Sequence, residues 1–304
     1  MGLFLLTLLL GACAGNGDTP RQSDGQGQIE SPLLAEADLD NEWRISVVEG
    51  SGAEVCSFTE KELVAAIASL DSLPQGAPGR FAHAYSTINN WPTSRFYAAD
   101  GYDAASVLAL AGLYDTAQTI TFRGVDGYEI SLTREQIFSP QYNYPHAGED
   151  GDGAEPVFAL IAWRWREGSD DMASIRADKP CFIIGQSNPF EHTNSAFVES
   201  VSEIIVSDAP CEQWLAATIF PMPGAIAAGE KVKLQHPDFG LVKIHYTLDG
   251  NEPTPLSPMY NPSTYQPELN VPIPVNETTV IKAIVCGYGK SDSEIAEFMF
   301  TIAE

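Results

Sequence analysis

The side chains that most often act as metal ligands or nucleophiles, cysteine and histidine, each occur five times. The cysteines are residues 13, 56, 181, 211 and 286, and the histidines are residues 83, 146, 192, 236 and 245. Neither set contains a Cys-x-x-Cys or His-x-x-x-His spacing, so we predict no metal site built from neighbouring ligands. Asp249 and Glu252 have the chemistry for glycoside hydrolysis. They lie in a Leu-Asp-Gly-Asn-Glu-Pro sequence, however, which predicts a turn.

Cys13 ends an apolar run that closes with Leu10-Gly-Ala-Cys13. The run is shorter than the roughly 20 residues that span a bilayer, but it fits the apolar part of an export signal. Its last four residues resemble a bacterial lipobox, whose cysteine becomes linked to diacylglycerol. We therefore predict a signal peptide at 1–12, lipidation of Cys13, and a location at the cell envelope, on the extracytoplasmic face of a bacterial membrane. No Lys or Arg precedes the run, which leaves the true start of the protein open.

Residues 13–40 are rich in Gly, Gln, Ser and Asp, a composition typical of a flexible tether. The whole chain has 41 acidic and 16 basic residues and a formal net charge of −25. Such a charge repels nucleic-acid phosphates and anionic lipid head groups. We expect no nucleic-acid partner, and we expect the lipid to provide the link to the membrane.

Four cysteines remain if Cys13 is acylated, and an exported protein can form disulfides. The sequence does not decide the pairing among Cys56, Cys181, Cys211 and Cys286. Cys181 and Cys286 lie in apolar runs, where cysteine often serves as a small apolar side chain.

Two regions differ in their periodicity. Residues 41–208 mix strand and helix patterns: Thr59 caps a predicted helix over 59–70, Gly112 ends another over 104–112, and Asp126-Gly127 predicts a hairpin turn. In Trp163-Arg-Trp165 we expect core aromatics with an outward arginine, and the alternative is aromatic stacking on a sugar. Residues 218–304 carry alternating strands at 231–235, 243–248, 279–285 and 296–302, which predict a small β-sandwich.

Three separated blocks identify the second region more closely. They are Ile244-His-Tyr-Thr-Leu-Asp-Gly-Asn-Glu-Pro-Thr254, Thr278-Thr-Val-Ile-Lys-Ala-Ile-Val285 and Gly289-Lys-Ser-Asp-Ser-Glu-Ile295. Together they resemble the immunoglobulin-like module appended to chitobiases and β-hexosaminidases. The resemblance implies an accessory module without chemistry of its own.

The first region is similar to the molybdopterin-binding domain of sulfite-oxidase-type oxidoreductases. The matching pieces are Thr59 to Leu63, a segment over 102–113 that ends Leu-Ala-Leu-Ala-Gly-Leu, Asp126-Gly-Tyr128, and Lys179-Pro-Cys-Phe-Ile-Ile-Gly-Gln186. The expected fold class is therefore an α+β sulfite-oxidase-like domain at 41–208, followed by an all-β immunoglobulin-like sandwich at 218–304.

Active members of that family bind molybdenum through a cysteine in a Cys-Val-x-Gly-Trp segment. The corresponding run here is Thr87-Ile-Asn-Asn-Trp91, which has threonine at the cysteine position. A hydroxyl cannot supply the soft anionic ligand that the metal prefers. Basic residues that would hold the pterin phosphate are also few in this region. We expect no cofactor, and bound molybdopterin is the alternative.

The resemblance leaves a vestigial pocket, and we predict no catalytic or metal-binding residue in it. Six residues are candidates for lining it, with ordinary packing as the alternative: His83, Thr87, Arg95, Gln186, His192 and Asn194.

We expect a noncatalytic surface lipoprotein that binds or scaffolds at the envelope. Its ligand would be a small molecule, a glycan or a protein. One alternative is a molybdopterin-dependent oxidoreductase with an atypical metal ligand. The other is a carbohydrate-binding surface protein, which the usual setting of the C-terminal module suggests.

Overall fold

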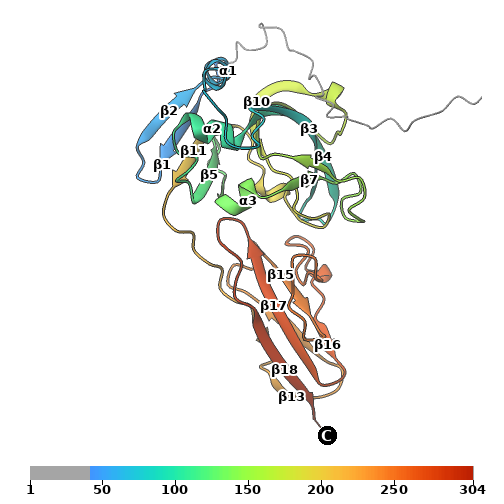
Figure 1. Cartoon of the computed structure of the whole chain (residues 1–304). Helices are drawn as coiled ribbons and strands as arrows, with labels where there is room; N and C mark the ends of the chain where they lie inside the picture. Colours follow the sequence, from blue (N-terminus) through green and yellow to red (C-terminus); the bar gives the residue numbers. More distant parts are fainter. Residues whose placement is uncertain (1–41, 304) are drawn as a thin grey trace, which may run out of the picture. The chain divides into compact units, whose positions relative to one another are not determined.

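The protein is mostly β-strand, with a few short helices, over residues 42–303, the part of the chain that the computed structural model describes (Figure 1). These residues belong to one compact unit, 34–304, and contain two separate hydrophobic cores. The predicted signal peptide, the lipidation of Cys13 and the tether lie outside the described residues. No helix within 42–303 has the length and apolar character needed to cross a membrane.

The first core lies between two sheets. In one sheet, β1 (Ile45–Glu49) pairs in parallel with β11 (Val201–Ser207), so the two ends of the first region lie side by side. β2 (Glu54–Phe58) extends this sheet beyond β1, and the hairpin of β5 (Thr119–Gly124) and β6 (Glu129–Thr133) extends it beyond β11. The predicted hairpin is confirmed, with Gly127 at φ 83° in its turn.

The other sheet has the order β10, β9, β4, β3. Its strands are β3 (Arg80–Ile88), β4 (Ser94–Asp103), β9 (Leu160–Glu167) and β10 (Arg176–Ile183). Phe182 from this sheet stacks on Phe122 from the first one and joins the two faces in the core. A small pair, β7 (Gln141–Asn143) and β8 (Glu155–Val157), stands beside them.

The helices of the first region are short: α1 (Glu60–Ala68), α2 (Ala104–Leu110) and α3 (Arg134–Phe138). α1 begins with the predicted capping box, in which Thr59 and Glu62 bond each other's backbone N–H groups. α2 ends before Gly112, which adopts φ 69°. Both predicted helices are confirmed, although α1 ends earlier than the predicted residue 70.

The prediction of an outward Arg164 is wrong. Its side chain is 3% exposed, and its Nη1 lies 2.5 Å from Oε1 of the equally buried Glu60. Alternation along β9 does turn Arg164 away from Trp163, which packs in the first core. The face to which Arg164 turns is covered by the start of α1, and Glu60 supplies the counter-charge that a buried guanidinium requires.

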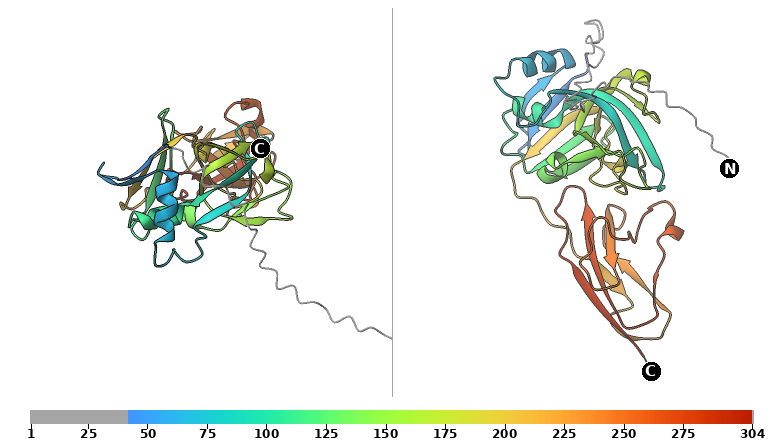
Figure 2. Two further views of the ribbon diagram at one scale, coloured as in Figure 1. Left: turned by 90° about the horizontal axis from the view of Figure 1, so that it is seen from above. Right: turned by 45° about the vertical axis from the view of Figure 1, so that its right-hand side comes forward.

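The second core lies inside a sandwich of two sheets, which Figure 2 shows from two further directions. The predicted strands are confirmed. One sheet contains β12 (Thr218–Phe220), β14 (Glu230–Gln235) and β16 (Ile273–Val275), and the other contains β13 (Gly224–Ile226), β18 (Ala296–Ile302), β17 (Thr279–Gly287) and β15 (Val242–Thr247).

The four described cysteines are free thiols, so none of them pairs with another in the structure. Cys181 is fully buried in the first core, as expected of a small apolar side chain.

Candidate functional site

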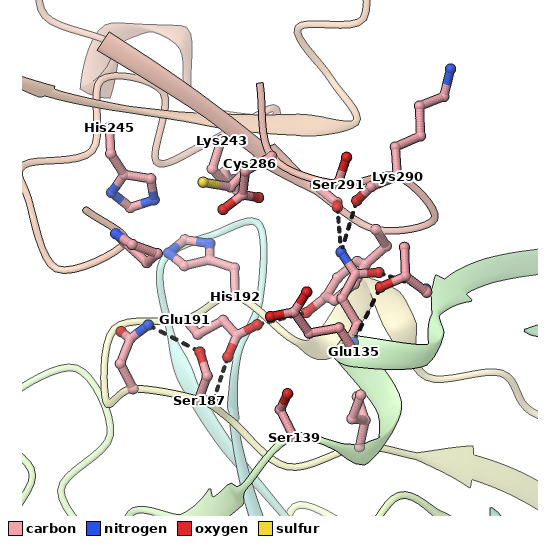
Figure 3. Close-up of a pocket in the computed structure, with 18 of the residues that line it drawn as sticks. Glu135, Ser139, Ser187, Glu191, His192, Lys243, His245, Cys286, Lys290 and Ser291 are labelled. Carbon is pink, nitrogen blue, oxygen red and sulfur yellow. Dashed lines mark hydrogen bonds between the residues drawn. The ribbon is translucent and has the colours of Figure 1, made fainter. Parts of the chain in front are cut away.

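A pocket of about 540 Å³ lies over the outward face of β15 and β17 (Figure 3). Its opposite wall comes from α3 and from the loop that follows β10. The volume is within the range of pockets that enclose small molecules. A second pocket, of about 250 Å³, is lined by none of the six predicted site residues.

Strand alternation positions the first wall. Val242 and Ile244 point into the second core, so Lys243 and His245 lie on the other face of β15. Cys286 is the direct cross-strand partner of Lys243 and shares that face. All three side chains line the pocket.

The second wall begins where the chain leaves β10 at Gly185. A Cβ atom there would lie 2.4 Å from Cγ2 of Val157, so only glycine fits. Gln186 follows and is fully buried. It therefore fixes the start of the loop that carries Glu191 and His192 into the pocket.

Gln136 holds the two walls together at one end of the pocket. Its Oε1 accepts from the N–H of Thr133 at 2.9 Å, which completes the capping box of α3, and from the N–H of Gly289 at 3.0 Å. Its Nε2 donates to the carbonyl of Gly287 at 2.7 Å. One amide thus caps a helix and binds the turn that follows β17.

A second attachment involves the segment from Thr87 to Trp91. The Asn90 carbonyl accepts from the Ser263 hydroxyl at 2.7 Å, and the Trp91 ring stacks on Tyr265 with centroids 5.4 Å apart. Residues 90 and 91 therefore contact the C-terminal sandwich.

Lys243 has no carboxylate partner among the described residues. Its Nζ donates to Oδ1 of Asn90 at 3.3 Å and to the carbonyls of Asn261 and Pro262 at 3.3 and 3.2 Å. These three acceptors match the three protons of an ammonium group. Burial lowers the pKa of Lys243 to about 8, because carbonyl dipoles only partly replace water around the charge.

Two neutral histidines face each other across the pocket, with their rings pointing inward in Figure 3. His245 Nδ1 lies 2.9 Å from the Ser257 carbonyl, which can only accept, so Nδ1 carries the proton and Nε2 is an acceptor. Among residues 42–303, no hydrogen-bond partner reaches the buried Nδ1 of His192. Burial, followed by the charges of Lys243 and His245, lowers the pKa of His192 to about 3, and burial also lowers that of His245.

Two acidic groups of the pocket, Glu191 and Asp292, have raised pKa values. Glu191 accepts from the Ser187 N–H and, at 3.4 Å, from the Tyr288 hydroxyl. Burial raises the pKa of Glu191 and of Asp292. It also raises the pKa of the Cys286 thiol, which is a poor nucleophile at neutral pH as a result. No set of three or more His, Cys, Asp or Glu side chains within 42–303 is arranged to hold a metal ion.

Three predicted site residues lie in or beside a filled polar cluster, which we define as Ser86, Thr87, Gln186 and Thr193. All four are fully buried. Thr193 Oγ1 donates to Thr87 Oγ1 at 2.7 Å, and Ser86 Oγ donates to Gln186 Oε1 at 2.5 Å. Asn194, the next residue, donates to the Tyr97 hydroxyl at 3.2 Å.

The other three predicted residues are separated. Arg95 is the strand partner of Thr87, but its side chain is exposed. His83 stacks on Phe81 and has its Nε2 3.6 Å from a Glu155 oxygen. His192 alone of the six lines the pocket. The structure therefore does not gather the six residues around one cavity.

A molybdenum cofactor does not fit at Thr87. The hydroxyl is fully buried and bonded to Thr193, which leaves no room for a metal ligand. Cys181 cannot replace it, since this thiol is buried in the core, 3.6 Å from the Phe182 carbonyl, and lines neither pocket.

Sequence reasoning missed most of the pocket, including Lys243, His245, Glu191 and Asp292. The alternation in Val242-Lys-Ile-His245 did place a lysine and a histidine together on one outward face. Such a face is normally solvated, and nothing local indicates that a loop of the first region covers it.

Comparison with known proteins bears on the sandwich. No match to the chain was found among curated proteins. A protein-family match was found for a segment that contains β14 to β17, and therefore one wall of the pocket. Residues 221–297 match the chitobiase/beta-hexosaminidase C-terminal domain family, in agreement with the resemblance that the sequence blocks indicated.

Proposed function

We propose that the protein is a noncatalytic binding protein of the bacterial cell surface, anchored through Cys13, and that it takes a small molecule into the pocket of His192 and His245. The observation that carries this proposal is the buried Nδ1 of His192, which has no hydrogen-bond partner among residues 42–303, together with the inward-pointing imidazole of His245, whose Nδ1 is bonded to the Ser257 carbonyl. Buried polar atoms normally have partners, so such atoms at a cavity point to a ligand.

The chemistry of the pocket favours binding over catalysis. A catalytic nucleophile or base needs a pKa suited to its task. The Cys286 thiol is held protonated by burial, and the protons of Lys243 are taken by three carbonyl groups. Neither group is poised to react.

The rest of the proposal extends the sequence expectations. Residues 41–208 would be a sulfite-oxidase-type domain in which the hydroxyl of Thr87 has replaced a metal ligand. Leu10-Gly-Ala-Cys13 would supply the lipid anchor. Growth with an alkyne-tagged fatty acid tests this part, because wild-type protein should be labelled and a Cys13→Ser variant should not. Equal labelling of both would contradict the anchor.

Screening by ligand-observed NMR against a mixed library of neutral, cationic and anionic small molecules tests the binding function. Ser139 is exposed at the edge of the pocket, so Ser139→Trp should block it without disturbing the core. Hits should bind the wild type and lose at least about tenfold in affinity with Ser139→Trp, the loss that about 1.4 kcal/mol produces. Ser51→Trp, at an exposed turn outside the pocket, is the matched control.

The absence of any hit sensitive to Ser139→Trp would contradict the binding proposal. Metal analysis of protein produced with an ample molybdenum and pterin supply tests the rival enzyme. Stoichiometric molybdenum would contradict the noncatalytic function.

A further inference from the structure

We infer that the pocket binds an uncharged, hydroxyl-bearing molecule of the size of a mono- or disaccharide, whose hydroxyl groups donate to His192 and His245. The inference rests on the proposed function and names the ligand class of the same site.

The pocket presents acceptors. His245 Nε2 is an acceptor because Nδ1–H is bonded to the Ser257 carbonyl, and the buried Nδ1 of His192 has no partner within the described residues. The two rings approach from opposite walls (Figure 3). A ligand that carries several hydroxyl groups can donate to both rings at once.

The protein offers few free donors in return. Gln136 uses both of its amide atoms, and Lys243 already donates to three oxygens. Lys290 forms a 2.6 Å ion pair with Glu212, and its ammonium points away from the pocket in Figure 3. An anionic ligand would therefore find no unpaired cation among the described lining residues.

A cationic ligand would be disfavoured as well. The ammonium of Lys243 acts on His192 strongly enough to lower its pKa. On the same grounds it would repel a cation beside the imidazoles. Desolvation raises the pKa of Glu191 and of Asp292, so it weakens both carboxyl groups as anionic partners.

All of these shifts have the same largest cause, desolvation. Lys243, His192 and His245 have lowered pKa values, and Glu191 and Asp292 have raised ones. Surroundings of this kind are poor at solvating either sign of charge. Such surroundings bind a polar but uncharged molecule with a smaller desolvation free energy than a charged one.

Apolar side chains complete the site. Phe190, Leu241 and Met259 line the pocket and are at least partly exposed. They can contact the C–H faces of a sugar ring while the histidines accept from its hydroxyl groups.

Isothermal titration of the full-length protein with three size-matched probes tests the ligand class: glucose, glucosamine as the cation and glucuronate as the anion. Cellobiose and N-acetylglucosamine extend the neutral series. We expect at least one neutral saccharide to bind, and to bind at least about tenfold more tightly than its charged counterparts. Its affinity should change less than twofold between pH 6 and 7, because His192 stays neutral and Lys243, whose pKa is about 8, stays mostly protonated in that range.

His192→Phe removes the ring nitrogens but breaks no bond within the described structure, and should weaken the neutral ligand at least about tenfold. His146→Phe, the same change at an exposed loop position, should have no effect. Should His192→Phe fold poorly, ¹⁵N NMR of histidine-labelled wild type provides an independent readout. The His192 and His245 ring nitrogens should shift on saturation with the ligand.

Tighter binding of glucosamine or glucuronate at the histidines would overturn the ligand class and leave the binding function standing. Failure of all neutral saccharides to bind would overturn the inference. The library screen with Ser139→Trp separately decides whether the pocket binds anything.

Discussion

The filled polar cluster and the pocket both use the loop from Gln186 to Thr193, but they differ in how far their polar side chains are hydrogen-bonded within the protein. In the cluster, the side chains bond in two pairs, Ser86 with Gln186 and Thr193 with Thr87. In the pocket, the buried Nδ1 of His192 has no hydrogen-bond partner within residues 42–303, and the Nδ1–H of His245 donates to the Ser257 carbonyl, which leaves its Nε2 as an acceptor. Polar side chains that hydrogen-bond within the protein stabilise the fold. A polar atom without a partner at a cavity can instead bind a ligand.

The loop from Gln186 to Thr193 serves both regions. Gln186 and Thr193, at its ends, turn into the cluster, and Glu191 and His192, between them, turn into the pocket. The cluster thus anchors the loop that presents the pocket's second wall. Substitutions in the cluster should cost stability, whereas substitutions in the pocket should mainly change pH dependence and binding.

The largest effect is expected for Gln186→Ala. It removes the acceptor of Ser86, the donor to the Glu191 carbonyl and a fully buried side chain. We expect a loss of about 3 to 4 kcal/mol in the free energy of unfolding, measured by urea denaturation. Gln235→Ala, at an exposed position of β14, should cost less than about 0.5 kcal/mol. Equal losses in the free energy of unfolding for the two variants would contradict a special contribution of the buried cluster to stability.

Lys243→Met should change how stability depends on alkaline pH. The pKa of Lys243 is about 8 in the folded protein, below its usual value of 10.5, so the unfolded chain binds more protons between these values. Wild-type stability should therefore rise relative to the variant, by at most about 2 kcal/mol from pH 8 to 9.5. Denaturation series at both pH values measure the difference, and exposed Lys231→Met is the control. A difference that does not vary with pH would contradict the prediction.

His192→Phe should show a pH dependence of the same sign, but in the acid range. The folded pKa of about 3 is below the usual 6.5, so between these values the unfolded chain binds a proton that the folded protein does not. Wild type should lose about 1 kcal/mol relative to the variant from pH 6.5 to 5.5. The groups that both proteins share cancel in this comparison. His146→Phe should not change the acid dependence, and parallel curves for wild type and His192→Phe would count against a neutral His192.

Glu191→Gln should have the smallest effect. The variant keeps an acceptor for the Ser187 N–H, its amide N–H can donate to the Tyr288 hydroxyl oxygen, and it removes a carboxylate that burial disfavours. Because the folded pKa is raised, the ionised carboxylate costs stability above it. We expect the variant to be more stable than wild type by about 0.5 kcal/mol at pH 8, with the gain disappearing toward pH 4. Thermal melts at the two pH values test this, and a lower melting temperature at pH 8 would contradict it.

Local sequence alone determined several elements of this protein. The capping box of Thr59 and Glu62, the turn at Asp126-Gly127 and the alternation of β15 and β17 were all predicted, because each depends on residues within a few positions of one another. The separated blocks of the sandwich also carried its family, which the match over residues 221–297 confirms.

Tertiary structure alone decided where the buried charges and the pocket lie. Arg164 meets Glu60 across 104 positions of sequence, and Lys243 meets Asn90 across 153. Alternation gives the direction of a side chain but not what covers the face it points to. The outward face of β15 could have met water, and the loop anchored by Gln186 is what removes that water and makes a pocket.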